Sequence, residues 1–208
     1  MMKKKSFKGG AMLNPVPAVM VSLGDDKPNI ITIAWTGIVN SSPPMTYISV
    51  RKERYSYDIL KKTGEFVINL CTEKLAFATD YCGVKSGRDI DKFNEMKLTP
   101  LPCELVSCPM IKESPLNIEC RVTQVIELGS HDMFLAEIVR VHADENIIDV
   151  KGRIRLDKAG LVAYNHGEYF PLKSQPVGRF GFSVMKPKTR KKINREKRKP
   201  NFKKCETN

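Results

Sequence analysis

Three residues between positions 51 and 56 have the types and spacing that suit an anion. Arg51 ends a predicted strand, and Arg54 and Ser56 stand at the start of the helix expected to follow. A helix start offers free backbone N–H groups and the positive end of the helix dipole. Two guanidinium groups would add charge-assisted hydrogen bonds to a phosphate. We therefore predict a phosphate site here, the alternative being that both arginines are ordinary surface charges.

A group of uncharged polar residues, Asn40, Ser41 and Ser42, precedes the arginines. Pro43 and Pro44 follow directly, and because proline fixes the backbone φ angle, we expect a rigid loop. Such a loop could present its side chains to a bound ligand through hydrogen bonds. The alternative is that the two serines are turn residues without a ligand.

A third polar group lies in the segment CGVKSGRDIDKF, further along the chain. Its glycines, Gly83 and Gly87, would let the backbone approach a ligand closely, and Ser86, Asp89 and Lys92 supply polar side chains. From the residues alone, an exposed loop without a ligand is the alternative.

Alternating apolar residues predict that most of the chain forms short strands that position these groups. The segments with this pattern are 18–23, 30–36, 47–51, 66–70, 118–128, 133–141 and 161–164. Residues 129–132, Gly-Ser-His-Asp, read as a hairpin connection and place His131 at its tip. Trp35 shares a face with Ile31 and Ile33, which favours a core position over stacking on a ligand.

Helices are expected to be few and short. The first covers residues 56–62, with Ser56 as its N-cap and Gly64 just past its end. A second covers 73–82 and is stopped by Gly83, and a third covers 91–94. Many short strands without a β-α-β alternation predict a mainly β fold, a closed antiparallel barrel with two or three short helices at its edge.

The formal net charge of +12 is unevenly distributed over the 208 residues. From position 186 onward, eleven basic and two acidic residues give a net charge of +9, which leaves +3 for the first 185 residues. A basic segment with so few apolar residues cannot bury enough surface to fold alone. We therefore expect one domain over 1–185 and a flexible basic tail over 186–208. The tail could contact nucleic acid through counterion release, but its composition favours a solvated extension.

Motifs that usually carry enzyme chemistry are missing from the sequence. It has no G-x-G-x-x-G, Walker A, H-E-x-x-H or G-x-S-x-G pattern, and three histidines are few for a metal site. We therefore predict no metal site, and expect a bound cofactor to perform the difficult step while the protein positions it.

The cysteines and the apolar segments indicate a cytoplasmic protein. None of the six cysteines forms a C-x-x-C pair of the kind that binds zinc or iron–sulfur clusters. We expect thiols, a redox role for Cys82 or Cys120 being the alternative. No stretch approaches the ~20 apolar residues that span a membrane. No apolar run follows the N-terminal lysines, so we expect no signal peptide.

Five segments together resemble the flavin reductase-like, FMN-binding split-barrel family, and within it the flavoredoxin branch. They are KPNIITIAWTGIVNSSPP (27–44), SVRKERYSYDIL (49–60), GEFVINL (64–70), DYCGVKSGRDIDKF (80–93) and GSHDMFLAEIVRV (129–141). Their order and spacing make the resemblance specific, and it extends over about residues 10–185. The basic tail lies outside it.

The resemblance implies FMN bound at the edge of an antiparallel Greek-key split barrel, commonly in a homodimer with the flavin near the subunit interface. The residues that it places around the isoalloxazine ring and ribityl chain are Trp35, Thr36, Asn40, Ser41 and Ser42. Those that it places at the phosphate are Arg51, Arg54 and Ser56. Those that would close over the flavin are Ser86, Gly87, Asp89 and Lys92, with His131 approaching from the late hairpin. Lys92 is the candidate cation beside the flavin N1–C2=O side, where it would favour the reduced state.

The function implied is that of an oxidoreductase that passes reducing equivalents through bound FMN to free flavin or a protein partner. NADH, NADPH or a redox protein would be the donor. One alternative is an electron carrier without NAD(P)H turnover. The last-ranked alternative is a nucleic-acid-binding module acting through the basic tail, because the rest of the chain has no RNA-binding motif or aromatic ladder.

Overall fold

The computed structural model describes residues 3–187 and 189. The chain divides into two units, Met1–Ser174 and Gln175–Asn208. In the second unit the described residues include a short 3-10 helix, η4 (Phe182–Val184). The domain boundary expected after residue 185 stays a prediction. Apart from residues 186, 187 and 189, the basic tail lies outside the described residues.

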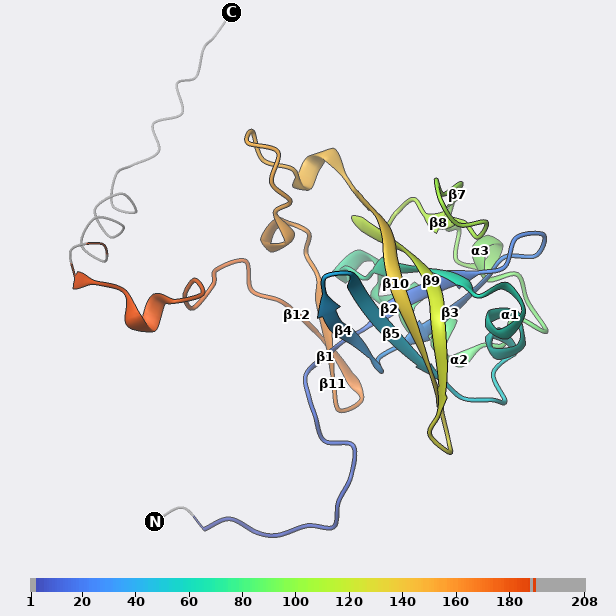
Figure 1. Cartoon of the computed structure of the whole chain (residues 1–208), viewed down its shortest axis with the longest axis horizontal. Coiled ribbons are helices and arrows are strands. Elements are labelled where there is room, and N and C mark those ends of the chain that lie inside the picture. Colours follow the sequence, from blue (N-terminus) through green and yellow to red (C-terminus); the bar gives the residue numbers. More distant parts are fainter. Residues whose placement is uncertain (1–2, 188, 190–208) are drawn as a thin grey trace, which may run out of the picture. The chain divides into compact units, whose positions relative to one another are not determined.

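Seven antiparallel strands form the main sheet of the first unit (Figure 1). In spatial order they are β3 (Asn29–Ile33), β2 (Val19–Leu23), β6 (Glu65–Leu70), β9 (Leu116–Glu127), β10 (Asp132–Ala143), β5 (Pro44–Val50) and β4 (Thr36–Ser41). The prediction of a mainly β, antiparallel fold is therefore confirmed.

The two edge strands of this sheet, β3 and β4, are consecutive in the chain. Ala34 and Trp35, which separate them, form the seam of the barrel. Because only two residues join β3 to β4, the sheet must curl until its two edge strands lie next to each other. At the seam, the backbone N–H of Ser49 donates to the Trp35 carbonyl at 2.9 Å. The prediction of one strand over 30–36 with Trp35 in the core was wrong. The strand breaks before Trp35, whose side chain is 37% exposed.

Two smaller sheets complete the first unit. The first has the order β1-β11-β12 and contains β1 (Val16–Pro17), β11 (Val162–Asn165) and β12 (Glu168–Pro171). The second pairs β7 (Pro100–Leu101) with β8 (Met110–Ile111). In the first, Val16 pairs with Tyr164, so residues near both ends of this unit meet. Sequence analysis predicted the strand at 161–164 but missed β12.

The barrel interior is an apolar core built from the alternating residues of the main strands. Val19, Val21, Ile48 and Val50 belong to it, together with the fully buried Phe66. Burying each such side chain contributes roughly 1.5–3 kcal/mol. The opposite face of β2 and β3 is also buried, since it packs against the helices outside the barrel in a second apolar cluster. Both faces of these strands therefore hold the site elements in place.

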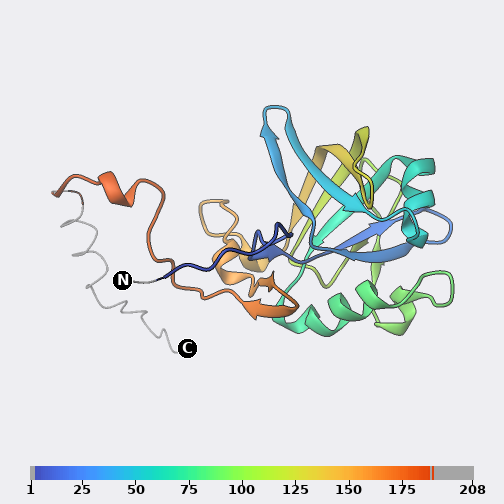
Figure 2. The ribbon, with the colours of Figure 1, turned by 90° about the horizontal axis from the view of Figure 1, so that it is seen from below.

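Three short α-helices lie outside the sheet: α1 (Tyr55–Thr63), α2 (Ala76–Val84) and α3 (Lys92–Glu95). Figure 2 shows α1 (teal) and α2 (green) flanking the strands. The 3-10 helices of this unit are η1 (Glu73–Leu75), η2 (Glu145–Ile147) and η3 (Leu156–Lys158). The predicted two or three short helices are thus confirmed.

Two predictions about helix ends were wrong. Arg54, not Ser56, occupies the N-cap of α1, where no side chain caps the helix. Ser56 lies one residue inside the helix, buried, and its Oγ accepts a hydrogen bond from Asn29 Nδ2 at 2.9 Å. The predicted C-terminal Gly64 is confirmed, with a left-handed φ of 66°.

Helix α2 continues through Gly83 and ends at Val84. A Cβ on Gly83 would lie 3.2 Å from Thr32 Cβ on β3, so the glycine lets the helix pack closely on the strand. The Thr32 hydroxyl donates to the Thr79 carbonyl across the same contact. Gly83 therefore serves helix–strand packing and does not terminate the helix.

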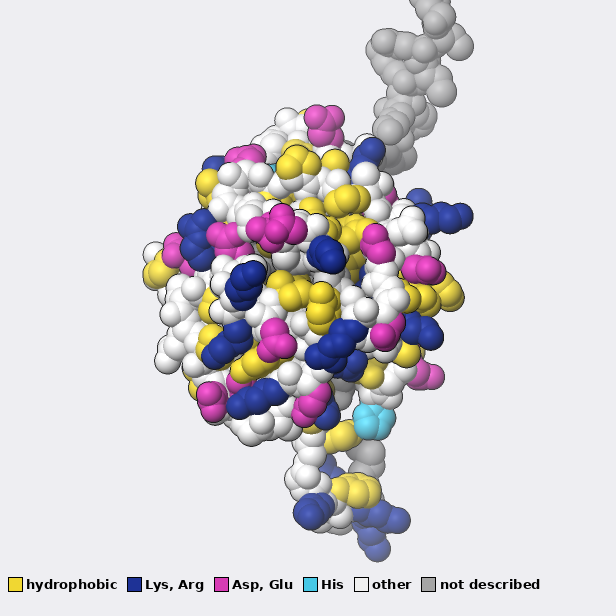
Figure 3. Space-filling view, turned by 90° about the vertical axis from the view of Figure 1, so that its right-hand side faces the viewer, with side chains coloured by type: hydrophobic (Ala, Val, Ile, Leu, Met, Phe, Trp, Pro, Cys, Tyr) yellow, Lys and Arg dark blue, Asp and Glu magenta, His cyan; other side chains and the backbone are white. Residues whose placement is uncertain are grey.

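The surface and the cysteines of the described residues agree with the sequence-based expectations. On the face shown in Figure 3, basic and acidic side chains are interspersed, in keeping with the small net charge of residues 1–185. No helix within the described part of the chain is long and apolar enough to cross a membrane. The five cysteines found there are free thiols. Burial raises the pKa of the Cys82 thiol to about 11 and also raises the pKa of Cys120, so both are protonated at neutral pH.

Candidate functional site

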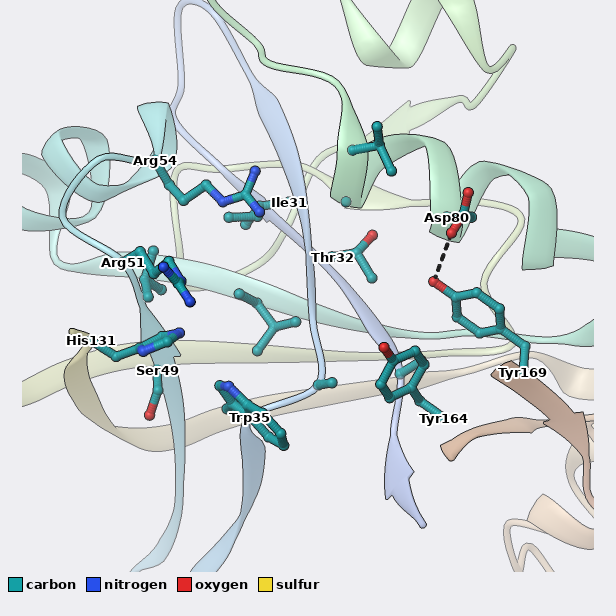
Figure 4. A pocket seen from close by; sticks show the side chains of 16 residues that line it. Ile31, Thr32, Trp35, Ser49, Arg51, Arg54, Asp80, His131, Tyr164 and Tyr169 are labelled. Carbon is teal, nitrogen blue, oxygen red and sulfur yellow. Dashed lines mark hydrogen bonds between the residues drawn. The ribbon is translucent and has the colours of Figure 1, made fainter. Parts of the chain in front are cut away.

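A cavity of about 320 Å³ opens beside the barrel seam (Figure 4). Its walls come from β3, the end of β5, the start of α1, helix α2, the turn between β9 and β10, and the β11–β12 hairpin. The volume is in the range of small-molecule and cofactor sites. Its lining changes in chemistry from one end to the other.

The basic end of the cavity consists of Arg51, Arg54 and His131, which lie together on one side of Figure 4. Arg51 follows the last residue of β5, Arg54 is the N-cap of α1, and His131 lies in the turn between β9 and β10. Within the described part of the chain, neither arginine forms a salt bridge. Two uncompensated guanidinium groups beside a helix start can bind an anion.

A buried carboxylate fixes the elements that carry this basic end. Asp132 follows His131 and is fully buried, and Tyr57 on α1 donates its O–H to Asp132 Oδ2 at 2.6 Å. Lys52 Nζ lies 3.5 Å from Asp132 Oδ1. The hydrogen bond to Asp132, with burial, raises the pKa of Tyr57 to about 12, so it remains a donor. These contacts join the β9–β10 turn, α1 and the β5–α1 connection.

The position of His131 favours its neutral form. Burial, and then the nearby Arg51 charge, lower the pKa of His131 below its ordinary value. His131 Nδ1 lies 3.0 Å from the Ser130 hydroxyl oxygen. A neutral imidazole can donate or accept a hydrogen bond at the edge of an anion site.

Apolar side chains form another part of the cavity wall. Ile31, Ile33 and Val50 line the cavity together with Trp35 at the seam. Figure 4 shows the Trp35 side chain between the basic end and Tyr164. An apolar wall with an aromatic edge suits a planar ring system.

The aromatic–acidic end of the cavity consists of Asp80, Tyr164 and Tyr169. Tyr169 donates its O–H to Asp80 Oδ1 at 3.3 Å, and its ring meets that of Tyr164 edge-to-face at 5.5 Å. Burial, and then the Asp80 charge, raise the pKa of Tyr169 to about 12. Sequence reasoning gave these residues no role, because Asp80 is on α2 whereas the tyrosines come from β11 and β12, which a local pattern does not connect.

Three of the predicted site residues are buried and already paired away from the cavity. Thr36 donates to the Tyr47 carbonyl at 2.6 Å, and Ser56 accepts from Asn29. Lys92 is 3% exposed, and its Nζ donates to the carbonyls of Ile30 at 2.6 Å and Cys82 at 2.8 Å. Burial lowers the pKa of Lys92 to about 8.

Three further predicted residues, Asn40, Ser41 and Ser42, lie at the exposed tip of the β4–β5 hairpin, outside the cavity. Asn40 Nδ2 donates to the Pro43 carbonyl at 2.9 Å within the hairpin. The hairpin projects from the rest of the sheet in Figure 2 (blue). A contact between these residues and a ligand stays a prediction.

The predicted loop residues Ser86, Gly87 and Asp89 do not line the cavity, and Gly87 lies next to Tyr55 at the start of α1. Ser86 Oγ accepts from the Arg88 backbone N–H at 3.2 Å, and Asp89 is exposed. A Cβ on Gly87 would lie 2.2 Å from Asn29 Oδ1, so the backbone passes directly over that side chain. Of the predicted set, the structure therefore brings together Trp35, Arg51, Arg54 and His131 in the cavity.

Residues 10–173 match the model of the flavin reductase-like domain. An uncharacterized protein of Archaeoglobus fulgidus is 33% identical over 133 residues, which cover 64% of this chain and 75% of the relative. The family match over residues 10–173 spans most of the first unit and includes every residue that lines the cavity.

Two solved structures share both the fold and part of the sequence. The flavoredoxin of Desulfovibrio vulgaris (Miyazaki F) superposes with a TM-score of 0.81 at 32% identity, over 87% of this chain and 100% of that one. The flavoredoxin from Methanosarcina acetivorans has a TM-score of 0.77 at 25% identity, over 88% of this chain and 100% of that one. The mainly β, antiparallel split-barrel fold is thereby confirmed, and the chain belongs to the flavin reductase-like domain family.

Proposed function

We propose that this chain is an FMN-binding oxidoreductase that passes reducing equivalents through the bound flavin to free flavin or a protein partner. The observation that carries the proposal is the basic end of the cavity. Arg51 and Arg54 lack carboxylate partners in the described part of the chain, and an apolar wall adjoins them. The family match supports a flavin-related redox function in general.

The residues present fit FMN chemically. A phosphate carries close to two negative charges at neutral pH, which two guanidinium groups can neutralise with paired hydrogen bonds. The helix start at Arg54 adds backbone N–H groups. The wall formed by Ile31, Ile33 and Trp35 suits the flat, largely apolar ring system.

When bound, FMN supplies the redox chemistry, which the protein side chains cannot. Arg51 and Arg54 would hold the phosphate, and His131 would border it. Trp35 and the β3 side chains would orient the ring and exclude water from one face. The donor is NADH, NADPH or a redox protein. The sequence has no dinucleotide-binding fingerprint that would select one of these three donors.

The proposal includes a homodimer. Strand β4 is an edge strand whose Ile38 and Val39 are 69% and 49% exposed. Exposed apolar side chains on a sheet edge favour association with another chain. A partner seated there would cover the β4–β5 hairpin, which carries Asn40, Ser41 and Ser42. A stable monomer with bound flavin in a sedimentation experiment would contradict this part.

A cytoplasmic location belongs to the same proposal. The five described cysteines are free thiols, and reduced cysteines are typical of the cytosol.

The decisive experiment is a titration of the purified chain with FMN and, in parallel, with riboflavin. Trp35 is the single tryptophan of the chain and lines the cavity, so its fluorescence reports occupancy directly. We expect saturable quenching, with FMN bound roughly 100- to 10,000-fold more tightly than riboflavin, because two charge-assisted hydrogen bonds contribute roughly 1.5–3 kcal/mol each. Equal affinity for both ligands would refute the phosphate assignment, and no binding of either would refute the function.

A second step separates the reductase from the electron carrier. NADH or NADPH is added without oxygen to the FMN-loaded protein while its visible absorbance is recorded. Bleaching, followed by turnover when free flavin is supplied, supports the reductase. A coloured protein that both nucleotides leave oxidised is a carrier with another donor.

A further inference from the structure

Helix α2 buries its small side chains and exposes large ones. Its buried residues are Ala78, Thr79 and Cys82. Phe77 is 76% exposed and Val84 is 69% exposed. An amphipathic surface helix ordinarily turns its apolar residues toward the core, so packing within the barrel does not account for these two side chains.

The exposed apolar side chains lie along one side of α2. Phe77, Tyr81 and Val84 follow at i, i+4 and i+7, which are positions on one face of a helix. The Phe77 and Tyr81 rings stack, with centroids 6.4 Å apart and an interplanar angle of 23°. We call these three residues the α2 stripe. Single exposed apolar residues are ordinary, but a group of them on a surface marks a contact site.

The α2 stripe reaches the rim of the cavity. Val84 lines the cavity, as does Asp80, which follows Phe77 by three residues. A Cβ on Gly83 would lie 3.2 Å from Thr32 Cβ, so the helix packs directly on β3, whose side chains form another part of the cavity wall. A protein bound to the α2 stripe therefore lies next to the proposed flavin site.

The size of the α2 stripe indicates a transient contact. A helix of 9 residues is about 14 Å long, and two aromatic residues with one valine expose roughly 300 Å² at this level of exposure. A stable interface buries about 800 Å² on each partner, whereas electron-transfer complexes are at the low end of interface size. The area suits a redox protein that binds briefly and is too small for a permanent dimer.

The proposed contact between two copies of the chain uses a different element. It involves the edge strand β4 with the exposed Ile38 and Val39. Figure 2 shows α2 (green) on the side of the sheet away from the β4–β5 hairpin (blue). A partner copy bound at that hairpin is not expected to cover the α2 stripe.

We propose that the α2 stripe is the docking surface of a small electron-transfer protein, whose redox group lies behind an apolar surface of its own. The inference rests on the proposed flavin function and assigns its protein partner to one face of the molecule. Each encounter transfers one electron. Two encounters with a reduced partner, together with two protons from water, convert oxidised FMN to its reduced form and leave two partner molecules oxidised.

Binding is tested first on the full chain without flavin. The ¹⁵N-labelled chain is titrated with oxidised [2Fe–2S] ferredoxin at about 0.3 M salt, which screens general attraction between this basic chain and an acidic partner. Amide signals of residues 77–84 are expected to shift or broaden, while those of residues 148–154 remain unchanged. Changes elsewhere in the chain without any on α2 would overturn the proposal.

Phe77→Ser is the decisive variant, because Phe77 is largely exposed and does not line the cavity. The FMN-loaded chain is mixed with reduced ferredoxin in the absence of oxygen, and the second-order rate of flavin reduction is measured. Loss of the apolar contact should lower this rate roughly 10- to 100-fold. Reduction by dithionite, which needs no docking surface, should keep the wild-type rate. An unchanged rate with ferredoxin would overturn the proposal.

Two further variants serve as controls. Phe77→Leu keeps the surface apolar and should retain most of the wild-type rate with ferredoxin. Val150→Ser removes a fully exposed valine that does not line the cavity, and this rate should not change. A rate lowered equally in Val150→Ser and Phe77→Ser would overturn the proposal, because the effect would not be specific to α2.

Sedimentation of wild type and Phe77→Ser tests the other occupant of the stripe. If the wild type is a dimer that this substitution dissociates, the α2 stripe is a contact between copies and the proposal is overturned. If ferredoxin neither binds nor reduces the chain, the docking surface is wrong, while FMN binding and turnover of NADH or NADPH would still support the flavin function. If the chain binds no flavin, that function fails, and amide NMR of the flavin-free chain decides whether α2 is a docking surface.

Discussion

The basic end of the cavity and the buried cluster around Glu119 both concentrate charge, but they satisfy it differently. Glu119 on β9 is fully buried, and its carboxylate accepts from the backbone N–H groups of Glu104, Leu105 and Val106 at 3.0, 2.7 and 3.0 Å. His142 Nε2 lies 2.5 Å from the same carboxylate. In contrast, the Arg51 guanidinium forms no salt bridge within the described residues.

Charged groups whose partners lie within the protein stabilise the fold, whereas charged groups without such partners are able to bind a ligand. A buried charge with a full set of partners stabilises its surroundings and cannot turn to a ligand without losing those contacts. Lys92 belongs with Glu119 in this respect, since two carbonyls accept from its ammonium group. Partner geometry, more than residue type, thus distinguishes Lys92 from Arg51.

The largest expected effect comes from removing both arginines. Arg51→Ala with Arg54→Ala should weaken FMN binding roughly 100- to 10,000-fold, because two charge-assisted hydrogen bonds are lost. Riboflavin affinity should remain at the wild-type level, since riboflavin lacks the phosphate. Titrations that follow Trp35 fluorescence measure both affinities.

The matched control for this pair is Lys61→Ala with Lys62→Ala. It removes two exposed basic residues from the last turn of α1 and changes the net charge by the same amount. FMN affinity close to wild type in this control would show that the weakened binding of the arginine variant comes from the position of the arginines in the cavity and not from the net charge. A loss as large as that of the arginine pair would show that general charge attraction holds the ligand.

Glu119→Ala should affect the fold and leave the ligand site intact. The variant leaves three backbone N–H groups and His142 without an acceptor, so the free energy of unfolding should fall by roughly 3–5 kcal/mol. Urea denaturation measures this loss, and FMN affinity at low urea should equal that of wild type. If Glu119→Ala had the stability of wild type but bound FMN more weakly, Glu119 would serve the ligand site and not the fold.

The pH dependence of this stability has a defined sign. Burial raises the pKa of Glu119, but hydrogen bonds from His142 and from the Glu104 and Leu105 backbones outweigh it, and the net pKa lies below the ordinary value. The stabilisation is therefore present above the pKa of the unfolded chain and is lost as the pH falls through the lowered folded value. Glu119→Ala should lack this acid-dependent loss.

Lys92→Met tests the sequence-based assignment of Lys92 to the flavin. Methionine fills similar space but leaves the carbonyls of Ile30 and Cys82 without a donor, so stability should fall by roughly 1–3 kcal/mol. FMN affinity and the flavin reduction potential should not change. If the potential falls while stability is unaffected, Lys92 contacts the flavin as the family resemblance implied.

The smallest expected effect is a change in the titration of His131. Burial and Arg51 lower the pKa of His131 in the free protein, and a bound phosphate should raise it by offsetting the arginine charge. FMN binding should then take up protons between the two pKa values and strengthen as the pH falls through that window. The imidazole C–H signal, assigned with His131→Asn, measures this by NMR, and a pKa unchanged by FMN would contradict it.

The sequence predicted the strands because burial follows a local alternation. Val19 and Val21, or Ile48 and Val50, face the core as their spacing indicates. It predicted the basic end for a similar reason, since a strand end and a helix start lie next to each other around Arg51 and Arg54. The alternation of Ile31 and Ile33 continues to Trp35 in the sequence, so it gave no sign that the strand ends at Ile33.

The aromatic–acidic end could not be predicted, because its residues meet only through long-range pairing. Strand β11 joins β1, whose Val16 pairs with Tyr164 almost the whole unit away in sequence. The buried position of Lys92 could not be predicted for a related reason: the carbonyls of Ile30 and Cys82, to which its Nζ donates, come together only when α2 and α3 pack on β3. Local patterns contain neither contact.

Gly87 limits how the loop before α3 can change over evolution. A Cβ there would overlap Asn29 Oδ1 at 2.2 Å and crowd Tyr55 at 2.9 Å. Asn29 in turn supports Ser56 within the first turn of α1. In a library that varies every position of this loop, the exposed Arg88 and Asp89 should accept many amino acids, whereas position 87 should accept glycine alone. Substitution at position 87 is therefore limited by the small space beside Asn29, which holds the hydrogen atom of glycine but no Cβ.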